Sequence, residues 1–179
     1  MNQPVIILRY TICFIKKENR ILLLKRAKEP WKSCWNGIGG KLHADETALE
    51  SVVREAYEET GIDLGLAKEL NFTGIVTWNA EVEPGKTDEN MYGMYVFLAE
   101  MAEDQEAWTD ERSTREGILA WKPTEWIVDQ NNREVAHNIP YFLPQMIKNT
   151  NPLRYHSYFK GDKFDKVTLY DMPRGVSAY

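Results

Sequence analysis

The stretch from Gly40 to Ile62 constrains this chain more than any other part of it. It reads Gly-x5-Glu-x7-Arg-Glu-Ala-x-Glu-Glu-x-Gly-Ile, which places three glutamates, Glu55, Glu58 and Glu59, at positions i, i+3 and i+4. On a helix these side chains share one face and repel one another at neutral pH. Such a face is unfavourable unless something strongly positive lies between the carboxylates, and a divalent magnesium ion is the obvious candidate.

The same stretch carries the signals of one helix with two different faces. Thr47 and Glu50 form a capping-box pattern at its start, and Gly61 is a suitable left-handed residue at its end. The side opposite the glutamates has apolar residues at core-facing spacing, namely Leu49, Val52, Val53 and Ala56. We therefore predict a helix that packs on one side and stays polar on the other.

A glycine-rich loop precedes this helix. The run Trp35-Asn36-Gly37-Ile38-Gly39-Gly40-Lys41 contains three glycines, so its backbone can approach a ligand or a metal ion closely. Arg54 lies four residues before Glu58, at the spacing of a helical ion pair, and is expected to hold that carboxylate in place. A solvated acidic helix face is the simpler alternative, but the loop and the spacing together favour a functional site.

These residues resemble the Nudix box, the signature of hydrolases that cleave a nucleoside diphosphate linked to another group, and every fixed position of that signature is filled in residues 40–62. The resemblance implies an α/β fold, an α/β/α sandwich with a mixed β-sheet, and attack of water on a phosphorus atom. Glu46 would orient Arg54, and Arg54 would orient the catalytic carboxylates. The implied metal is Mg²⁺, with Mn²⁺ as a possible substitute, and its ligands would be Glu55, Glu58, Glu59 and the carbonyl oxygen of Gly40.

Length and composition predict a single domain over residues 1–179. A chain of 179 residues, of which 43% are hydrophobic, can bury a core without disulfides. Cys13 and Cys34 are too few for a disulfide framework, so we interpret both as reduced thiols of a cytoplasmic protein. The apolar run at residues 5–8 is interrupted by Arg9 and is too short to span a membrane.

The net charge restricts the class of partner. At −5 it argues against a nucleic acid polymer, because basic surface normally supplies that affinity. An acidic nucleotide hydrolase must instead draw its anionic substrate in through metal and a few local cations. We expect a nucleotide substrate, no membrane partner, and a monomer or homodimer.

Apolar, β-rich segments flank the box on both sides. Residues 5–15 and 20–26 are predicted to form a hairpin that leads toward the glycine loop. Residues 69–79 and 91–100 are predicted to form two more strands, joined by a polar loop containing Pro84-Gly85 that could border the active site. Together these segments predict the strands of one sheet.

The last third of the chain is predicted to add short helices and a second hairpin. Pro123 and Pro140 each begin a segment with helical patterning, consistent with proline in the first turn. A C-terminal hairpin extension is predicted over about residues 153–172, with strands at 153–160 and 164–171 and a turn at Gly161-Asp162. We see no repeat, low-complexity tract or interdomain linker.

Within the Nudix family the chain resembles the mutT-type branch, the 8-oxo-dGTP diphosphatases that remove oxidised purine nucleotides before a polymerase uses them. The resemblance is carried by the loop at residues 35–41, by Tyr10-Thr11 on the first strand, and by the stretch at residues 155–159. In that branch the loop asparagine, here Asn36, contacts the purine base. Its amide offers one acceptor and two donors to a purine edge, and the alternative is a hydrogen bond to its own backbone.

One stretch departs from that branch. Its animal-type members read the purine edge with two neighbouring aspartates before the last helix, whereas this chain has Ala136-His137-Asn138-Ile139-Pro140. Asn138 is a candidate base contact, and His137 is either a second one or a structural or surface residue. The hydrogen-bond donors and acceptors offered by this stretch would differ from those of the aspartate pair. The chain could therefore prefer a base other than 8-oxoguanine.

Charged residues outside the box helix extend the predicted site. Glu116 resembles a carboxylate that completes the metal site or acts as base in this family, and Glu111 is the competing choice. Arg26, at the end of the second strand, is a candidate phosphate contact because guanidinium matches phosphate geometry. Lys41 in the glycine loop and Thr11 are further candidate substrate contacts.

Together these features predict Mg²⁺-assisted hydrolysis of a purine nucleoside triphosphate, such as 8-oxo-dGTP, to the monophosphate and pyrophosphate. The general base is one of four glutamates, and the sequence leaves open which one, since box carboxylates are coupled and metal alters their protonation. The first alternative is a Nudix hydrolase for another nucleotide, such as an unmodified dNTP, ADP-ribose or a dinucleoside polyphosphate. The second is a non-catalytic Nudix module that senses a nucleotide or binds a protein.

Overall fold

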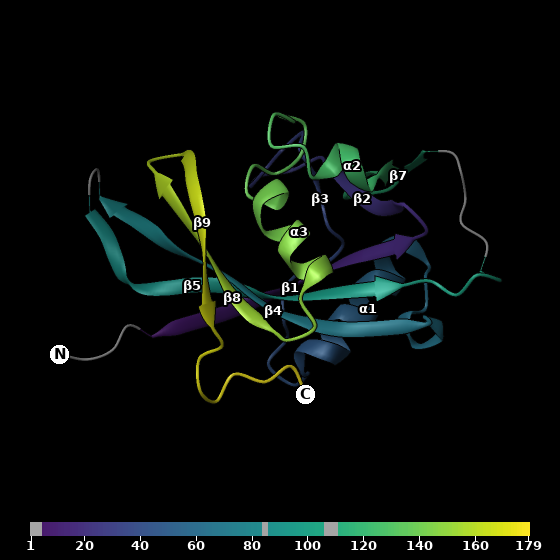
Figure 1. The fold of residues 1–179 in the computed structure, drawn as a ribbon, viewed down its shortest axis with the longest axis horizontal. Helices are drawn as coiled ribbons and strands as arrows, with labels where there is room; N and C mark the ends of the chain where they lie inside the picture. Colours follow the sequence, from purple (N-terminus) through teal and green to yellow (C-terminus); the bar gives the residue numbers. More distant parts are fainter. Residues whose placement is uncertain (1–4, 84–85, 106–110) are drawn as a thin grey trace.

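The structure, a computed structural model, describes residues 5–83, 86–105 and 111–179. Within these residues nine strands form one sheet in the order β6-β7-β2-β1-β5-β4-β8-β9, with β3 beside β2 (Figure 1). The strands are β1 (Ile6–Lys17), β2 (Arg20–Arg26), β3 (Trp35–Asn36), β4 (Glu69–Glu83), β5 (Lys86–Glu100), β6 (Arg112–Ser113), β7 (Gly117–Pro123), β8 (Leu153–Lys160) and β9 (Lys163–Asp171). The helices are α1 (Ala48–Thr60), the 3₁₀ turn η1 (Leu64–Leu66), α2 (Thr124–Ile127) and α3 (Ile139–Lys148).

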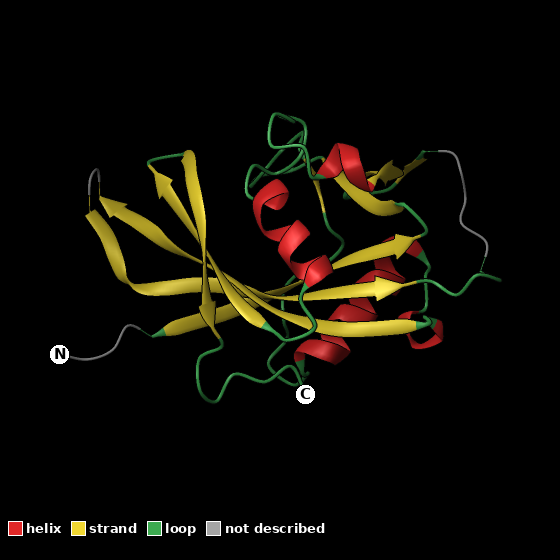
Figure 2. Cartoon of the chain, in the orientation of Figure 1, coloured by secondary structure: helices red, strands yellow, loops and turns green. Residues whose placement is uncertain are grey.

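Helices cover both faces of the sheet, which confirms the predicted α/β/α sandwich. Figure 2 shows α3 in front of the sheet and α1 behind it. The sheet is mixed, because β1 runs parallel to β5 and β4 runs parallel to β8, whereas β1 and β2 are antiparallel. Along β1, Ile12 and Phe14 pack on the α3 side, while Cys13 and Ile15 pack on the α1 side. Burying a side chain such as Phe14 contributes roughly 1.5–3 kcal/mol.

The predicted box helix is present as α1, and its ends match the prediction. Thr47 Oγ1 accepts a hydrogen bond from the Glu50 backbone N–H (3.2 Å), and Glu50 Oε2 accepts one from the Thr47 N–H (2.7 Å). Gly61 ends the helix with φ at 75°, a left-handed conformation that glycine adopts without strain. The apolar face packs against the core through Leu49, Val52, Val53 and Ala56.

The strand pair predicted before the box and the pair predicted after it are both present, and the second pair is longer than predicted. β1 and β2 form the first hairpin. β4 and β5 have 15 residues each, and their pairing continues to Glu83 and Lys86, so the segment predicted as a polar loop is mostly strand. A two-stranded antiparallel ribbon needs no apolar face along its whole length, which is why polarity was a poor guide there. Pro84-Gly85 lie outside the described residues.

The C-terminal hairpin is present and joins the central sheet. β8 and β9 pair as predicted, with Gly161 at φ 60° in the turn, and β8 also pairs in parallel with β4. After β9 the chain runs to the start of α1, where Ala178 is buried and its carbonyl oxygen accepts a hydrogen bond from Leu49 N (3.0 Å). These residues link the hairpin to the box helix.

The short helices and the cysteines also follow the prediction. Pro123 directly precedes α2, and Pro140 lies in the first turn of α3. Cys13 and Cys34 are both free thiols, and burial raises the pKa of the Cys13 thiol, which makes it a core residue instead of a nucleophile. Among the described residues, no helix combines the length and the apolar character that crossing a membrane would require.

Candidate active site

The glycine-rich loop lies against β1 and is fixed there by backbone hydrogen bonds. Ile38 exchanges two of them with Cys13, at 2.6 and 2.9 Å, and Thr11 N donates to Gly40 O at 2.9 Å. A Cβ atom at Gly40 would lie 2.5 Å from the carboxylate of Glu55. The absence of a side chain at Gly40 therefore allows the box helix to approach the loop closely.

Arg54 holds three of the predicted carboxylates. It binds Glu46 in a bidentate manner with distances of 2.6 and 2.9 Å, and its Nη1 donates to Glu55 (2.8 Å) and to Glu58 (3.3 Å). The hydrogen bonds from Arg54 lower the pKa of Glu46 to about 2. The structure thus brings together the residues for which the Nudix resemblance implies a chain of orienting contacts.

Glu59 makes a different contact from the other glutamates of the helix. Its Oε2 accepts a hydrogen bond from Gly39 N at 3.3 Å. Burial, followed by the negative charge of Glu55, raises the pKa of Glu59 to about 8. At neutral pH this group therefore retains a proton unless a nearby cation compensates its charge.

The donor set of the box fits a hard divalent cation. Mg²⁺ prefers oxygen ligands, and the glutamates and the Gly40 carbonyl offer only oxygen. In the structure Glu55 and Glu58 are directed to Arg54, while Glu59 is directed to Gly39. Within the described ranges, no three Asp, Glu, His or Cys side chains form a group that could already hold a metal ion.

Of the two candidate carboxylates outside the box, Glu116 lies near the glutamates. Its negative charge contributes to the raised pKa of Glu59, and it forms an ion pair with Lys28 at 3.4 Å. Glu111 instead pairs with Lys122 at 3.7 Å. This placement favours Glu116 over Glu111 as the additional carboxylate.

A cavity of about 620 Å³ lies between the glycine loop, α3 and the turn of the C-terminal hairpin. Gly39 and Gly40 form the end of the cavity that adjoins the box glutamates, and Asn36, Asn79 and Asn138 supply amide groups. Its apolar walls include Ile12, Trp31, Trp78, Met94, Phe142 and Phe159. A largely apolar cavity with a few polar groups is typical of a small-molecule site.

Asn36 and Asn138 both line this cavity, as expected for base contacts. Asn36 Oδ1 accepts a hydrogen bond from Gly37 N at 2.9 Å. The backbone contact that was the alternative for Asn36 is therefore present, and it leaves the amide nitrogen as the donor for a ligand. Asn138 is 7% exposed, and its Nδ2 lies 3.3 Å from Ser157 Oγ.

The other predicted substrate contacts differ in their relation to the cavity. Arg26 lines it, and its Nε donates to the Pro30 carbonyl at 2.7 Å. Thr11 also lines it, but the Thr11 hydroxyl is buried against Ser51 Oγ of α1 at 3.2 Å. Lys41 is exposed and lies outside the cavity, and its carbonyl oxygen accepts from Arg54 Nη2 at 3.3 Å. Of the two predicted cations, Arg26 is thus the one that lines the cavity.

Apart from Trp78, which the sequence places on a strand near the predicted cleft, the aromatic wall was not predicted. Trp31 comes from the loop between β2 and β3, Phe142 from α3 and Phe159 from β8. Trp31 contacts both His137 and Phe159, with ring centroids 5.3 and 6.4 Å apart. The aromatic residues near the start of the C-terminal hairpin were the one available signal, and only the pairing of β8 with β4 shows where they lie.

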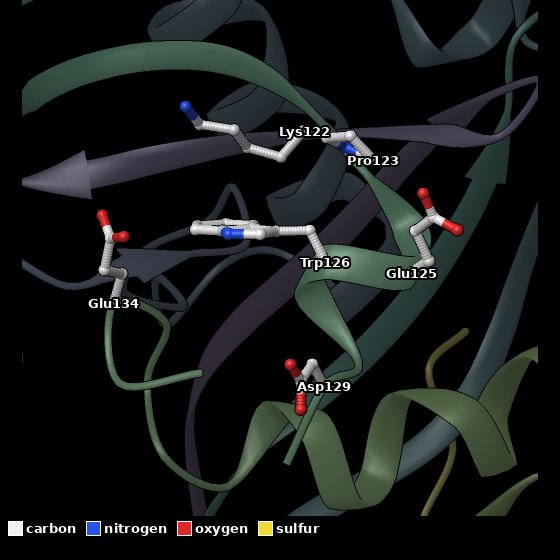
Figure 3. A pocket seen from close by; sticks show the side chains of 6 residues that line it. All are labelled: Lys122, Pro123, Glu125, Trp126, Asp129 and Glu134. Carbon is white, nitrogen blue, oxygen red and sulfur yellow. The ribbon is translucent and has the colours of Figure 1, made fainter. Parts of the chain in front are cut away.

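A second depression of about 770 Å³ lies beside α2 (Figure 3). Figure 3 shows the carboxylates of Glu125, Asp129 and Glu134 spread around Trp126 without converging on one point. The Lys122 ammonium group there lies 4.3 Å from the centre of the Trp35 ring. This depression contains none of the predicted site residues. We therefore assign the candidate site to the cavity beside the box.

The fold and this site define a class of protein. A glutamate-rich helix packs on one face of a mixed sheet, beside a glycine loop. Residues of that loop line a cavity suited to a small molecule. The NUDIX domain family matches residues 8–145. The chain belongs to the Nudix family, whose hydrolases act on phosphoanhydrides and typically depend on a divalent metal.

Relatives and solved structures support this assignment at different levels. The chain is 29% identical over 140 residues to the uncharacterized Nudix hydrolase YvcI of Bacillus subtilis, covering 78% of this chain and 79% of that protein. It is 50% identical over 48 residues to the ADP-ribose pyrophosphatase of Methanocaldococcus jannaschii, covering 27% of this chain and only 28% of that enzyme. The crystal structure of a MutT protein from Bacillus halodurans matches with a TM-score of 0.64 at 24% identity, covering 92% of this chain and 99% of that chain. At this identity the likeness shows the fold.

Proposed function

We propose that this chain catalyses the Mg²⁺-dependent hydrolysis of purine nucleoside triphosphates to the monophosphate and pyrophosphate, with 8-oxo-dGTP as the first substrate to test. One observation carries the proposal: Gly39 and Gly40 line the cavity and also contact Glu59 and Glu55. A nucleotide whose base enters the far end of the cavity would extend its phosphates toward these glutamates. Removal of oxidised purine nucleotides from the nucleotide pool is the role that this activity would serve.

The metal would be held by the oxygen donors of the box. Mg²⁺, or Mn²⁺ in its place, would bind Glu55, Glu58, Glu59 and the carbonyl oxygen of Gly40. When bound, it would supply a more nucleophilic water and neutralise charge on the leaving pyrophosphate.

The protein's own residues would position and deprotonate the reactants. Glu46 holds Arg54, and Arg54 holds Glu55 and Glu58. One of the box glutamates or Glu116 would accept the proton from the attacking water. These contacts keep the acidic groups oriented before the substrate arrives.

The remaining cavity residues would bind the other parts of the nucleotide. Arg26 lines the cavity, and its charge acts on Glu59 by lowering the pKa of that carboxyl group. It is therefore the cation suited to a phosphate group. Asn36 and Asn138 would hydrogen-bond the edge of the base, and the aromatic wall would pack against the faces of its rings.

ADP-ribose is the second candidate substrate. The relative from Methanocaldococcus jannaschii is named an ADP-ribose pyrophosphatase, although the aligned part is short. The adenine of ADP-ribose would enter the same cavity, and its diphosphate would reach the same glutamates. A non-catalytic module is disfavoured because every fixed position of the box at residues 40–62 is filled.

A substrate panel tests the proposal. We would measure kcat/KM from product formation in Mg²⁺ for 8-oxo-dGTP, dGTP, 2-hydroxy-dATP, dATP, dCTP and ADP-ribose. The purine triphosphates are expected to be the best substrates. A preference for ADP-ribose would move the assignment to the second candidate, and equal activity on dCTP would remove the purine assignment.

A matched pair of variants tests the metal site. Glu58→Gln is expected to abolish turnover while the fold persists, because it removes one anionic ligand without changing the size of the side chain. Glu125→Gln alters an exposed carboxylate on α2, outside the cavity, and is expected to retain full activity. Circular dichroism would check that both variants fold. Unchanged activity of Glu58→Gln would remove the metal-site assignment.

A further inference from the structure

Asn138 lies at the start of α3 but does not cap the helix. An asparagine at this position usually accepts a hydrogen bond from a backbone N–H of the first turn, whereas the Asn138 side chain makes no such bond. It is instead 7% exposed, lines the cavity and donates to Ser157 of β8 at 3.3 Å. Ser157 itself is 1% exposed. The amide of Asn138 is therefore available for a contact inside the cavity.

The hydrogen bond between Asn138 and Ser157 can run in either direction. A hydroxyl group can donate or accept, and an amide carries its acceptor and its donors on opposite sides. With Asn138 Nδ2 bonded to Ser157, the amide oxygen is left for a ligand. If the amide turns over, Ser157 donates to the amide oxygen and the NH₂ group is left for the ligand. Both arrangements keep the hydrogen bond between the two side chains.

By comparison, the hydrogen bond of the Asn36 amide can run in only one direction. Its amide oxygen is bonded to the backbone N–H of Gly37 at 2.9 Å, and a backbone N–H can only donate. Asn36 therefore presents a donor in every case, which suits a ring nitrogen such as N3, an acceptor that both purine classes carry. Ile139 and Phe142, which lie beside Asn138 on α3 and line the same cavity, are apolar and offer no side-chain hydrogen bond that would fix the Asn138 amide.

We propose that the Asn138–Ser157 pair allows the site to bind both 6-oxo and 6-amino purines with similar affinity. A 6-oxopurine presents an acceptor beside a ring N–H donor, and a 6-aminopurine presents a donor beside a ring nitrogen acceptor. A side chain of fixed polarity leaves a buried polar group unpaired with one of these edges, which is strongly unfavourable. The reversible pair satisfies either edge. This inference rests on the proposed function, because it concerns how the same cavity selects a base.

The test is equilibrium binding of dGMP and dAMP to the full chain by titration calorimetry. These monophosphates carry the two bases without an anhydride to cleave, so the result does not depend on turnover. For the wild type, the two Kd values are expected to agree within about fivefold, which is the smallest ratio that one unsatisfied buried group would impose. A larger ratio, or no binding of either nucleotide, would overturn the proposal.

Two variants of Asn138 separate base reading from packing. Asn138→Asp, measured at pH 8, replaces the reversible amide by a group that only accepts, and is expected to change the Kd ratio at least about tenfold. Asn138→Leu has a similar size and no polarity, so it should weaken both ligands by a similar factor and leave the ratio unchanged. Thermal unfolding would check that both variants fold. An unchanged ratio in a folded Asn138→Asp variant would overturn the proposal.

The two proposals fail in different ways. Similar binding of dGMP and dAMP without hydrolysis of any purine triphosphate would reject the proposed function and retain this inference. Hydrolysis restricted to one purine class, with a matching Kd ratio above about fivefold, would retain the function and reject this inference.

Discussion

The two ends of the candidate site are built in different ways. At the box end, Glu46, Arg54 and the three helix glutamates all come from one loop and one helix within residues 40–62. At the cavity end, Trp31, Asn138 and Phe159 come from a loop, the start of α3 and strand β8. The box end is a network of charges, whereas the cavity end combines aromatic walls with neutral amides. On the proposed function, a local segment would carry the chemistry, while the choice of substrate would depend on how the sheet brings distant segments together.

This contrast has a kinetic consequence. Changes at the box end should lower kcat, because they disturb groups that act on the reacting phosphate. Changes at the cavity end should raise KM or alter the ratio between substrates, because they disturb binding of the base. The kinetics of a substitution should therefore show at which end the residue acts.

Arg54→Ala is expected to have the largest effect. Glu46, Glu55 and Glu58 lose a shared partner, so kcat should fall by roughly 10²–10³-fold with little change in KM. Steady-state kinetics in saturating Mg²⁺ would measure both parameters. Arg54→Lys keeps the charge but loses the bidentate geometry, and should recover only a small part of the activity. A rise in KM as large as the fall in kcat would contradict the separation of the two ends.

Gly40→Ala should disturb the box end without removing any charge. The added Cβ would lie 2.5 Å from the Glu55 carboxylate, so Glu55 must move, and kcat should fall by roughly 10–100-fold. The Mg²⁺ concentration for half-maximal activity should rise in the same variant, as a metal titration of the rate would show.

Gly61→Ala is the matched control for Gly40→Ala. Gly61 has φ at 75°, and a Cβ added there would meet nothing within 4 Å, so alanine should cost about 1 kcal/mol of stability through backbone strain alone. Activity per folded molecule should be retained. If Gly40→Ala and Gly61→Ala behaved alike, the close approach of Glu55 would have no catalytic importance.

The same contrast explains what could be predicted from the sequence. The box helix was predictable because its capping residues, Thr47 and Glu50, and its glutamates follow helical spacing within a short stretch. Asn36 was predictable as a cavity residue because it lies in the adjoining loop. Trp31 and Phe159 were not, since their contact depends on long-range strand pairing that no local pattern records.

A similar limit applied to the strands. The continuous apolar, β-rich run of β1 identified that strand, because both of its faces pack against a helix layer. The far part of the β4–β5 hairpin has a polar sequence, so part of it was interpreted as a loop. Secondary structure was therefore predictable where an apolar run fills both faces of a strand, and less so where the sequence of a strand is polar.

Trp31→Ala should act at the cavity end. Removing the indole takes away one wall of the cavity and its contacts with His137 and Phe159, so KM should rise roughly tenfold while kcat changes little. Trp126→Ala removes the same side chain from the second depression and is expected to leave KM unchanged. An equal effect of the two substitutions would argue against the assignment of the nucleotide to the cavity.

The smallest expected effect is on stability and concerns Glu46. Its pKa is lowered to about 2, from an ordinary value near 4.5, chiefly by hydrogen bonds from Arg54. The folded state therefore gains stability from ionised Glu46 above pH 4.5, and loses this gain as the pH falls through about 2. With allowance for solvent screening, Glu46→Gln should lower the free energy of unfolding by about 1 kcal/mol at pH 7.

Urea unfolding of the wild type and Glu46→Gln between pH 7 and pH 2.5 would measure this difference. The difference should narrow as the pH falls below 4.5, because Glu46 of the unfolded chain then takes up a proton while the folded chain still holds it ionised against Arg54. Glu125→Gln, an exposed position on α2, should show almost no difference at any pH. If the Glu46→Gln difference were constant across this range, the charge of Glu46 would not be what holds Arg54, and the box end would owe its order to packing of α1 alone.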